Sequence, residues 1–459
     1  MGLGALVIYG VGDMLGAGIY AVLGKYAGEM GNAIWLAFAV SMIASMLTGL
    51  SYANLGSRYP KAAGSAYISY RAFNWPLLTY VIGLVTIASG LTSFATQSRA
   101  FAGYVLGYLG LALPTAKDPT LPLAAPWMVF GIAVAFILFL AAINFRGMRE
   151  STVMNAVCTA IEVGGLLFVV AVGLKFWGGV NLLEIPAANS TPENPTSTTL
   201  GTLSLFGLAG FALQGAVLTL YAFIGFEDMI NVSEEVKDPQ KTFPRGVILA
   251  LIITGIVYAA ISITAVSVVP WQQLSQSNQP MVDVVAKAAP WFPPALFTLV
   301  SVFAIANTAL LNYIMGSRLV YGLAKQGFLP AKLGAVHPTR RTPHVSIFVL
   351  MLVVIALALA GDISSLAGAT SLLLLFTFLV VNASLVILKL RKDEPKGAFE
   401  IPIAVPALGF LVCFTLIIAA LSDPARLESL KIGGVVVAIV TALYFLVRPK
   451  IDEEAAREL

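Results

Sequence analysis

Long apolar stretches recur along the chain about twelve times, and short polar segments separate them. Most of them reach the roughly 20 residues that an α-helix needs to cross the ~30 Å hydrocarbon core of a bilayer. Inside lipid, a helix satisfies its own backbone hydrogen bonds, so the pattern predicts an all-α polytopic membrane protein with about twelve transmembrane helices. The predicted spans lie near Gly2–Ala27, Ala33–Ser57, Pro76–Leu109, Trp127–Phe145, Ser151–Leu174, Leu205–Val232, Phe243–Val269, Pro294–Ala324, Val345–Ala360, Ile363–Leu390, Pro402–Leu421 and Ile432–Val447.

The composition supports a membrane protein and narrows its chemistry. Of 459 residues, 58% are hydrophobic and only 11% are charged, whereas soluble proteins carry about 25% charged residues. The two cysteines, Cys158 and Cys413, both lie inside apolar spans, which argues against a disulfide framework or a metal cluster. Both histidines, His337 and His344, fall in a predicted loop. Proton transfer through the membrane would therefore depend on carboxyl groups, and no metal or cofactor is expected.

Lysine and arginine alternate between rich and poor loops, which predicts the orientation of the chain. The even-numbered loops carry most of them, so these loops and both termini are expected in the cytoplasm, with the protein in the plasma (cell inner) membrane. The basic residues of the even-numbered loops and of the C-terminus are Arg58, Lys61, Arg71, Arg146, Arg149, Lys237, Lys241, Arg245, Lys325, Lys332, Arg340, Arg341, Lys389, Arg391, Lys392, Lys396, Arg448 and Lys450. The alternate loops hold only Lys117, Lys287, Arg426 and Lys431.

The first span is interrupted in a way that predicts a binding site. It contains the stretch GVGDMLGAGIY at Gly10–Tyr20, with four glycines and Asp13. Glycine permits a helix to unwind, and unwound backbone inside a membrane is tolerated only where protein or a wet cavity satisfies it. A charged residue at this depth is a candidate functional residue. We therefore predict a helix break at Met14–Gly18; the alternative is that the glycines serve close helix packing.

The sixth span repeats this interruption. Gly225 lies between aromatic residues in its middle, and Glu227 and Asp228 follow. Interrupted segments in corresponding places of two inverted halves indicate a binding site near the membrane midplane. The chain is accordingly predicted to form a single transport domain: a first repeat at 1–177, an inverted second repeat at 205–390, and two appended spans at 402–448. For Glu227, a position at the helix end near the headgroups is the alternative.

The two breaks together suggest the type of ligand. Freed amides at Gly16, Ala17 and Gly18 form the positive end of a half-helix and suit a carboxylate. Freed carbonyls at Met14, Tyr221 and Ile224 suit an ammonium group. A ligand that carries both groups on one carbon is an amino acid. The aromatic side chains Tyr221, Phe223 and Phe226 can form a lid or a cation–π wall over it, or can be ordinary core residues.

Four motifs resemble those of the amino acid–polyamine–organocation transporters, nearest to the cationic amino acid transporter branch. They read GAGIY at Gly16–Tyr20, YAFIGFE at Tyr221–Glu227, EEVKDPQKTFPRG at Glu234–Gly246 and SRLVYGLAKQGFLP at Ser317–Pro330. The resemblance implies a LeuT-like five-plus-five inverted repeat with broken helices 1 and 6, alternating access, and a gate at Tyr221. It implies a substrate site formed by Met14, Gly16, Ala17, Gly18, Ile19, Tyr221, Phe223, Ile224 and Asn307.

The chain departs from the family pattern at two positions that matter for coupling. Several sodium-independent relatives carry a lysine in span five that takes the place of a sodium ion, and Glu162 stands at that position here. Asp13 stands where relatives usually carry a small or amide residue. Burial disfavours the charged form of a carboxyl, so Glu162, Asp13 or Glu227 is expected to carry the coupled proton. Alternatively, Asp13 and Glu162 share a proton or hold a cation, or Glu162 is permanently protonated and only stabilises span one.

These features predict a secondary amino-acid transporter and not an enzyme. It is expected to work without sodium, by proton coupling or exchange. The three acids in the spans favour a cationic substrate, and a neutral amino acid is the alternative substrate. The alternatives are a polyamine transporter and, in a different class, an amino-acid sensor that does not transport. The expected partners are the substrate, protons and the lipid bilayer, with no nucleic acid. No disulfide-linked subunit is expected, because the loop Gly110–Pro126 has no cysteine.

Overall fold

The computed structural model describes residues 1–59, 64–111, 122–147, 152–187, 196–325 and 327–449. The side chains of Ala17, Glu234 and residues 152–156 are outside this description. Four of the basic residues used to predict the orientation, Lys61, Lys117, Arg149 and Lys450, also lie outside it.

The predicted all-α architecture is confirmed. Within the described residues, ten helical segments are long and apolar enough to cross a membrane, and two shorter apolar helices, α1 and α13, accompany them. One of the ten, Gly18–Arg58, runs from the second half of span one through span two. The helices in the predicted spans are α1 (Leu3–Met14), α2 (Ala17–Met30), α3 (Ile34–Arg58), α5 (Pro76–Tyr108), α6 (Pro126–Arg146), α7 (Thr152–Gly173), α8 (Leu205–Thr219), α9 (Pro239–Val268), α12 (Pro294–Lys325), α13 (His344–Ala360), α14 (Ile363–Leu390), α15 (Ala404–Leu421) and α16 (Leu427–Val447).

Short elements that hydropathy does not indicate lie between the spans. They are the helices α4 (Ser65–Phe73), α10 (Trp271–Gln276) and α11 (Pro280–Ala288), and an antiparallel pair of strands, β1 (Glu184–Pro186) and β2 (Ser197–Thr199). The strands lie in the long connector that precedes α8. The start of α3 holds this connector, because Trp35 Nε1 donates a 3.0 Å hydrogen bond to the Leu182 carbonyl. The hairpin thus depends on a tertiary contact.

Proline marks several helix starts. Proline occupies the first turn of α5, α6, α9 and α11. At this position the missing N–H is not needed and the fixed φ suits the helix. Elsewhere a polar side chain caps the helix: the Asp362 carboxylate accepts a 2.8 Å hydrogen bond from the Ser365 amide at the start of α14. These local signals place the helix ends close to those that the apolar runs predict.

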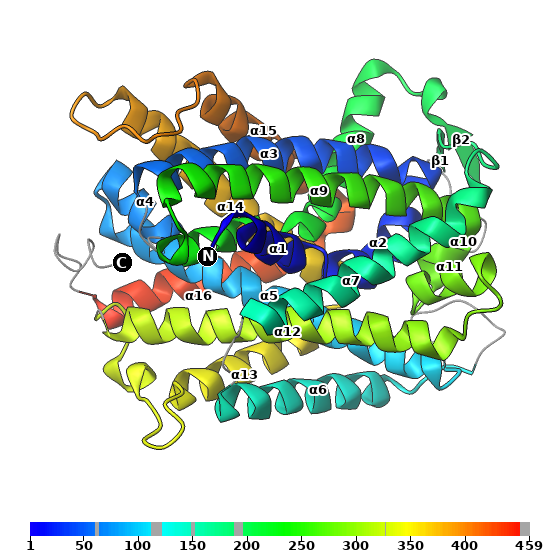
Figure 1. Ribbon diagram of the computed structural model, residues 1–459, viewed down its shortest axis with the longest axis horizontal. Helices are drawn as coiled ribbons and strands as arrows, with labels where there is room; N and C mark the ends of the chain where they lie inside the picture. Colours follow the sequence, from blue (N-terminus) through cyan, green and yellow to red (C-terminus); the bar gives the residue numbers. More distant parts are fainter. Residues whose placement is uncertain (60–63, 112–121, 148–151, 188–195, 326, 450–459) are drawn as a thin grey trace.

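Several helices pack around α5. This helix packs against α12, α14, α6 and α13, while α1 packs against α9 and α7. In Figure 1, α3, α9 and α12 follow the long axis of the molecule, and α1 and α2 lie between them. The β1–β2 hairpin, α10 and α11 gather at the right end of this view, and α4 lies at the left end.

Ionic contacts tie several segments together at the end of the bundle that holds α4. We call this end, with Arg58, Arg71, Lys389 and Arg391, the basic end. Arg58 donates two 2.7 Å hydrogen bonds to the Glu400 carboxylate, and Lys389 contacts the same carboxylate. Arg391 donates to the Arg71 carbonyl at 2.8 Å. These bonds fasten the α14–α15 connection to the ends of α3 and α4.

Candidate functional site

The first helix break lies at Leu15 and Gly16, inside the predicted interval. Helix α1 ends at Met14, where the Leu15 amide donates its last bond to the Val11 carbonyl at 2.8 Å, and α2 begins at Ala17. The final carbonyls of a helix and the first amides of the next have no partner within their own helices. The interruption therefore frees main-chain donors and acceptors in the middle of the bundle.

The second break lies at Ile224 and Gly225. Helix α8 ends at Thr219 and continues as a short 3₁₀ segment, η4 (Leu220–Phe223). Ile224 is extended, Gly225 has φ +125°, and a second 3₁₀ segment, η5 (Phe226–Glu235), follows. Only glycine adopts such a φ without strain, so Gly225 is required by the turn itself. The predicted interruption of both spans is confirmed.

The two broken segments lie directly against each other. A Cβ atom added to Gly18 would lie 2.6 Å from the Cα atom of Ala222, and one added to Gly225 would lie 3.0 Å from the Asp13 carboxyl carbon. Glycine at position 18 is thus required by close backbone packing. The structure combines the two interpretations of these glycines, because the segment is both broken and closely packed.

A tyrosine on α9 joins the two breaks. The Tyr258 hydroxyl donates to the carbonyl of Ala222 at 2.6 Å and also contacts the carbonyl of Met14. The side chain is completely buried, and its ring packs against Phe223 at a centroid distance of 5.2 Å. A hydroxyl has one hydrogen, so the two carbonyls share a single donor. Tyr258 consequently sets the spacing between α1 and η4.

A narrow cavity of about 10 Å³ lies beside the breaks. The broken segments and two further helices, α5 and α12, form its walls. Its lining residues are Asp13, Met14, Gly18, Ser93, Gln97, Tyr221, Ile224, Gly225, Thr308 and Asn312. None of these lining residues is a lysine, arginine or histidine. Tyr221 closes one side, since its hydroxyl lies 3.1 Å from Ser93 Oγ on α5.

The predicted binding residues divide into two groups. Four of them line the cavity: Met14, Gly18, Tyr221 and Ile224. Asp13, one of the three acids expected to carry the coupled proton, lines it as well. The others are not among its lining residues: Gly16, Ala17, Ile19, Phe223 and Asn307. The ring of Phe223 lies between Phe38 and Tyr258, so it packs in the core and does not form the expected aromatic wall over the cavity.

Glu162 lies outside the cavity, in a separate polar cluster. Its side chain is completely buried, and its Oε1 accepts a 2.9 Å hydrogen bond from Asn307 Nδ2 on α12. Its Oε2 and the neighbouring Thr159 Oγ1 have no hydrogen-bond partner among the described residues. Among the described residues, the Glu162 carboxyl therefore bonds α12 and not the end of α1.

The cluster around Glu162 nevertheless touches the first break. A Cβ added to Gly12 would lie 2.0 Å from Thr159 Oγ1, and one added to Gly16 would lie 1.7 Å from Thr308 Oγ1. Thr159 is one turn before Glu162, and Thr308 follows its partner Asn307. Any rearrangement of Glu162 is thus positioned to reach the end of α1 through these two threonines.

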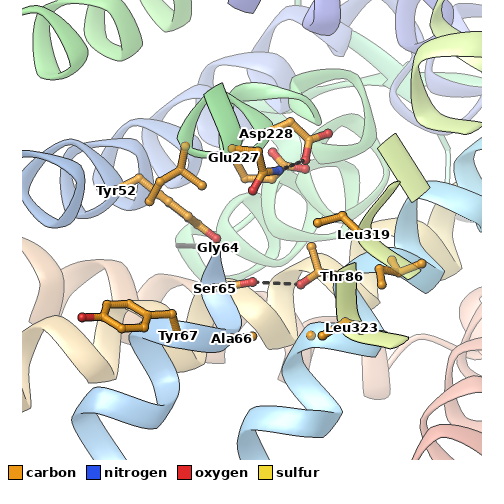
Figure 2. Close-up of a pocket in the computed structure, with 14 residues that line it drawn as sticks. Tyr52, Gly64, Ser65, Ala66, Tyr67, Thr86, Glu227, Asp228, Leu319 and Leu323 are labelled. Atoms are coloured by element: carbon orange, nitrogen blue, oxygen red, sulfur yellow. Dashed lines mark hydrogen bonds between the residues drawn. The ribbon is translucent and has the colours of Figure 1, made fainter. Parts of the chain in front are cut away.

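Glu227 and Asp228 line a second cavity of about 80 Å³. Figure 2 shows the two carboxylates on one side of it and Ser65 and Thr86 on the other. Glu227 is buried, and its Oε2 accepts a 3.0 Å hydrogen bond from the Gly225 amide. Glu227 is thus part of the break itself.

The three predicted acids therefore occupy three different environments. Asp13 lies in the first cavity, Glu227 in the second, and Glu162 in the cluster with Asn307. The sequence interpretation did not single out Tyr258 or Ser93, since an isolated hydroxyl in an apolar span has no distinctive pattern. Gln97 and Asn312 are polar residues within apolar spans, a feature that hydrogen bonds between helices explain equally well.

Comparison with known proteins gives a match to the amino acid permease family over residues 2–446. An uncharacterized transporter of Mycobacterium tuberculosis is 28% identical over 97% of this chain and 90% of its own length. The branched-chain amino acid permease BcaP of Bacillus subtilis is 25% identical over 90% of this chain and 86% of its own. Mouse cationic amino acid transporter 4 is 28% identical over 86% of this chain and 60% of its own.

Proposed function

Because the chain belongs to the amino acid permease family, we propose that it is a secondary amino-acid transporter that works by alternating access, independently of sodium, with proton coupling or substrate exchange. The family and the relatives' names identify a transporter and not an enzyme. The resemblance to the amino acid–polyamine–organocation superfamily is thereby confirmed. The relatives' names give different substrates. The kind of amino acid that this chain transports is therefore inferred from the residues of the site.

The observation that carries the proposal is the contact of the two breaks beside one cavity. The N-terminus of α2, which includes Gly18, offers main-chain amides to a carboxylate. Carbonyls near Met14, Tyr221 and Ile224 offer acceptors to an ammonium group. All four residues line the cavity. An α-amino acid presents both groups at the spacing of a single carbon, whereas a polyamine would leave the amides without an anionic partner.

Tyr221 is the proposed gate. Its side chain is buried, and its hydroxyl reaches Ser93 across the cavity. The residue belongs to η4, which the second break connects to η5. A change of the main chain at Ile224 and Gly225 would move the ring away from α5 and open the site.

Glu162 is the proposed proton carrier, and Asp13 and Glu227 are the next candidates. The Glu162 carboxyl is completely buried, and one of its oxygens has no partner among the residues that the structure describes. Burial of an unpaired charge is costly, so this environment favours the neutral form. Loss of the proton would create that charge beside Thr159 and Asn307. A movement of α7 or α12 against the end of α1 would bring this charge to a better environment. Such a movement would couple protonation to conformation.

The proposal includes the orientation and the internal repeats. The basic end is assigned to the cytoplasm of a cell whose inner membrane holds the protein, because cytoplasmic loops carry an excess of lysine and arginine. Both termini are placed on that side. The first repeat is 1–177, the inverted second repeat is 205–390, and residues 402–448 are appended spans.

Uptake by proteoliposomes tests this function. The purified protein is reconstituted, and the uptake of labelled amino acids and polyamines is measured with and without a pH gradient, in sodium-free buffer. We expect amino-acid uptake, with an amino acid competing about 10- to 150-fold better than the amine that lacks its carboxylate. Equal competition by the amine would favour a polyamine transporter. Saturable binding without uptake or exchange would favour a sensor.

A further inference from the structure

Gln97 presents an unsatisfied acceptor in the wall of the substrate cavity. The residue is on α5 and only 1% of its surface is exposed. Its Nε2 donates a 3.1 Å hydrogen bond to Ser93 Oγ. Its Oε1 is buried and has no hydrogen-bond partner among the described residues. A buried acceptor of this kind is expensive to leave unpaired, so its presence in a binding cavity calls for a donor from the ligand.

The orientation of this amide is held by a network. Ser93 Oγ accepts from Gln97 Nε2, lies 3.1 Å from the Tyr221 hydroxyl, and accepts from Asn312 Nδ2 at 3.5 Å. One of the two N–H groups of the Gln97 amide is therefore used within the protein. Its Oε1 has no hydrogen-bond partner among the described residues, and Gln97 is one of the residues that line the cavity.

Gln97 lies on a different helix from the groups assigned to the substrate backbone. The main-chain amides and carbonyls come from the two broken segments, α1–α2 and η4 with Ile224. Ser93 and Gln97 come from α5, and Asn312 comes from α12. The contact between Tyr221 and Ser93 shows that η4 and α5 face each other across the cavity. A substrate held by its carboxylate and ammonium groups at the breaks would direct its side chain towards α5.

We propose that Gln97 selects the substrate side chain, and that the transported amino acid carries a side chain that donates a hydrogen bond through a hydroxyl, a carboxamide or a protonated amine. This inference rests on the proposed function. An aliphatic side chain would bury Gln97 Oε1 without a partner, and a carboxylate would place a second acceptor against it. Sites built to bond a polar substrate discriminate strongly against the analogue that lacks the polar group.

Two pairs of near-isosteric amino acids test the selection: homoserine against norvaline, and ornithine against norleucine. Each is used to inhibit the uptake of the best labelled substrate into proteoliposomes. We expect the donor-bearing member of each pair to inhibit about 10-fold better or more. Gln97→Met, which keeps the size and removes the amide, should bring both ratios close to one.

Two further variants control this test. Ser98→Ala changes the next residue on α5, whose hydroxyl bonds the Phe94 carbonyl of its own helix at 2.8 Å, and should leave the ratios unchanged. Gln97→Glu keeps an acceptor and should preserve the preference for ornithine even if Gln97→Met does not fold. Equal inhibition within both pairs in the wild-type protein, or unchanged ratios in Gln97→Met, would overturn the inference alone. Absence of uptake for every amino acid would overturn the proposed function as well.

Discussion

The Tyr258 hydroxyl on α9 donates a 2.6 Å hydrogen bond to the carbonyl of Ala222 in η4. The same hydroxyl contacts the Met14 carbonyl at the end of α1, 244 positions away in the sequence. One buried side chain therefore connects the interrupted segments of both halves of the chain. The substrate groups assigned above depend on the distance between these segments, which makes Tyr258 a positioning residue.

We expect Tyr258→Phe to weaken substrate binding about 10-fold or more and to lower the stability of the folded protein. The change leaves two buried carbonyls without their donor, which costs about 1–3 kcal/mol. The measurements are substrate affinity and Tm in detergent. Tyr26→Phe is a matched control, because the Tyr26 hydroxyl is buried without a hydrogen-bond partner among the described residues. Its removal should be neutral or slightly stabilising; equal effects of both variants would exclude the positioning role.

Gly18→Ala should push the two broken segments apart. Its Cβ would lie 2.6 Å from the Cα atom of Ala222, and main chain cannot yield as a flexible side chain does. Overpacking of this kind typically costs about 1–3 kcal/mol, so we expect a lower Tm and loss of substrate binding. Gly131→Ala, inside α6 with no atom within 4 Å of the added Cβ, is the control and should leave both quantities unchanged. A Gly18→Ala protein with normal Tm and affinity would contradict the close contact.

Glu162→Gln should separate substrate exchange from proton coupling. The amide resembles the protonated carboxyl in size and cannot release the proton. We expect the variant to retain substrate binding and counterflow, but to lose the response of uptake to an imposed pH gradient. The measurement compares counterflow with gradient-driven uptake at several pH values. If the variant still accumulates substrate when a proton gradient alone drives uptake, the coupled proton is assigned to Asp13 or Glu227 instead.

Asn307 offers an independent test of the same cluster. Its Nδ2 donates the one hydrogen bond that the structure shows for the Glu162 carboxylate, at 2.9 Å. Asn307→Ala removes this donor without touching the cavity lining. We expect it to shift the pH dependence of uptake while the order of preferred substrates stays the same. A changed substrate order with an unchanged pH profile would assign Asn307 to the binding site instead.

Glu400 at the basic end should make stability depend on pH. Partial burial raises its pKa, but the hydrogen bonds from Arg58 and Lys389 outweigh this effect and lower the pKa to about 2. Since a free glutamate has a pKa of about 4.3, the stabilisation is present above that pH and is lost as the pH falls towards about 2. Glu400 is partly exposed, so solvent screening leaves a contribution on the order of 1 kcal/mol or less.

The test compares the Tm of the wild-type protein with that of Glu400→Gln. We expect the variant to melt at a lower temperature at pH 7 and the difference to shrink when both proteins are melted near pH 3. Glu428→Gln is the control, because Glu428 forms an ion pair with Lys431 on an exposed face of its own helix. A difference that persists unchanged at low pH would show that the ion pair is not its source.

The sequence by itself determined the apolar spans, the two breaks and the segregation of basic residues. These features are local: a helix crosses a bilayer if a run is apolar and long enough, and it breaks where glycine is needed. The positions of Gly16, Gly18 and Gly225 therefore located the interruptions. The acids Asp13, Glu162 and Glu227 were recognisable because charge is rare in such runs.

Only the tertiary structure decided which polar groups meet. In a span that is apolar on every face, no periodicity tells which side turns towards a neighbouring helix, so Phe223 was expected at the cavity but packs on Tyr258. Glu162 finds Asn307 at a distance of 145 positions in the sequence. Gln97 donates one hydrogen bond to Ser93, and its Oε1 has no partner in the described part of the chain. Each of these relations depends on helix rotation and register, which long-range packing sets and local composition does not.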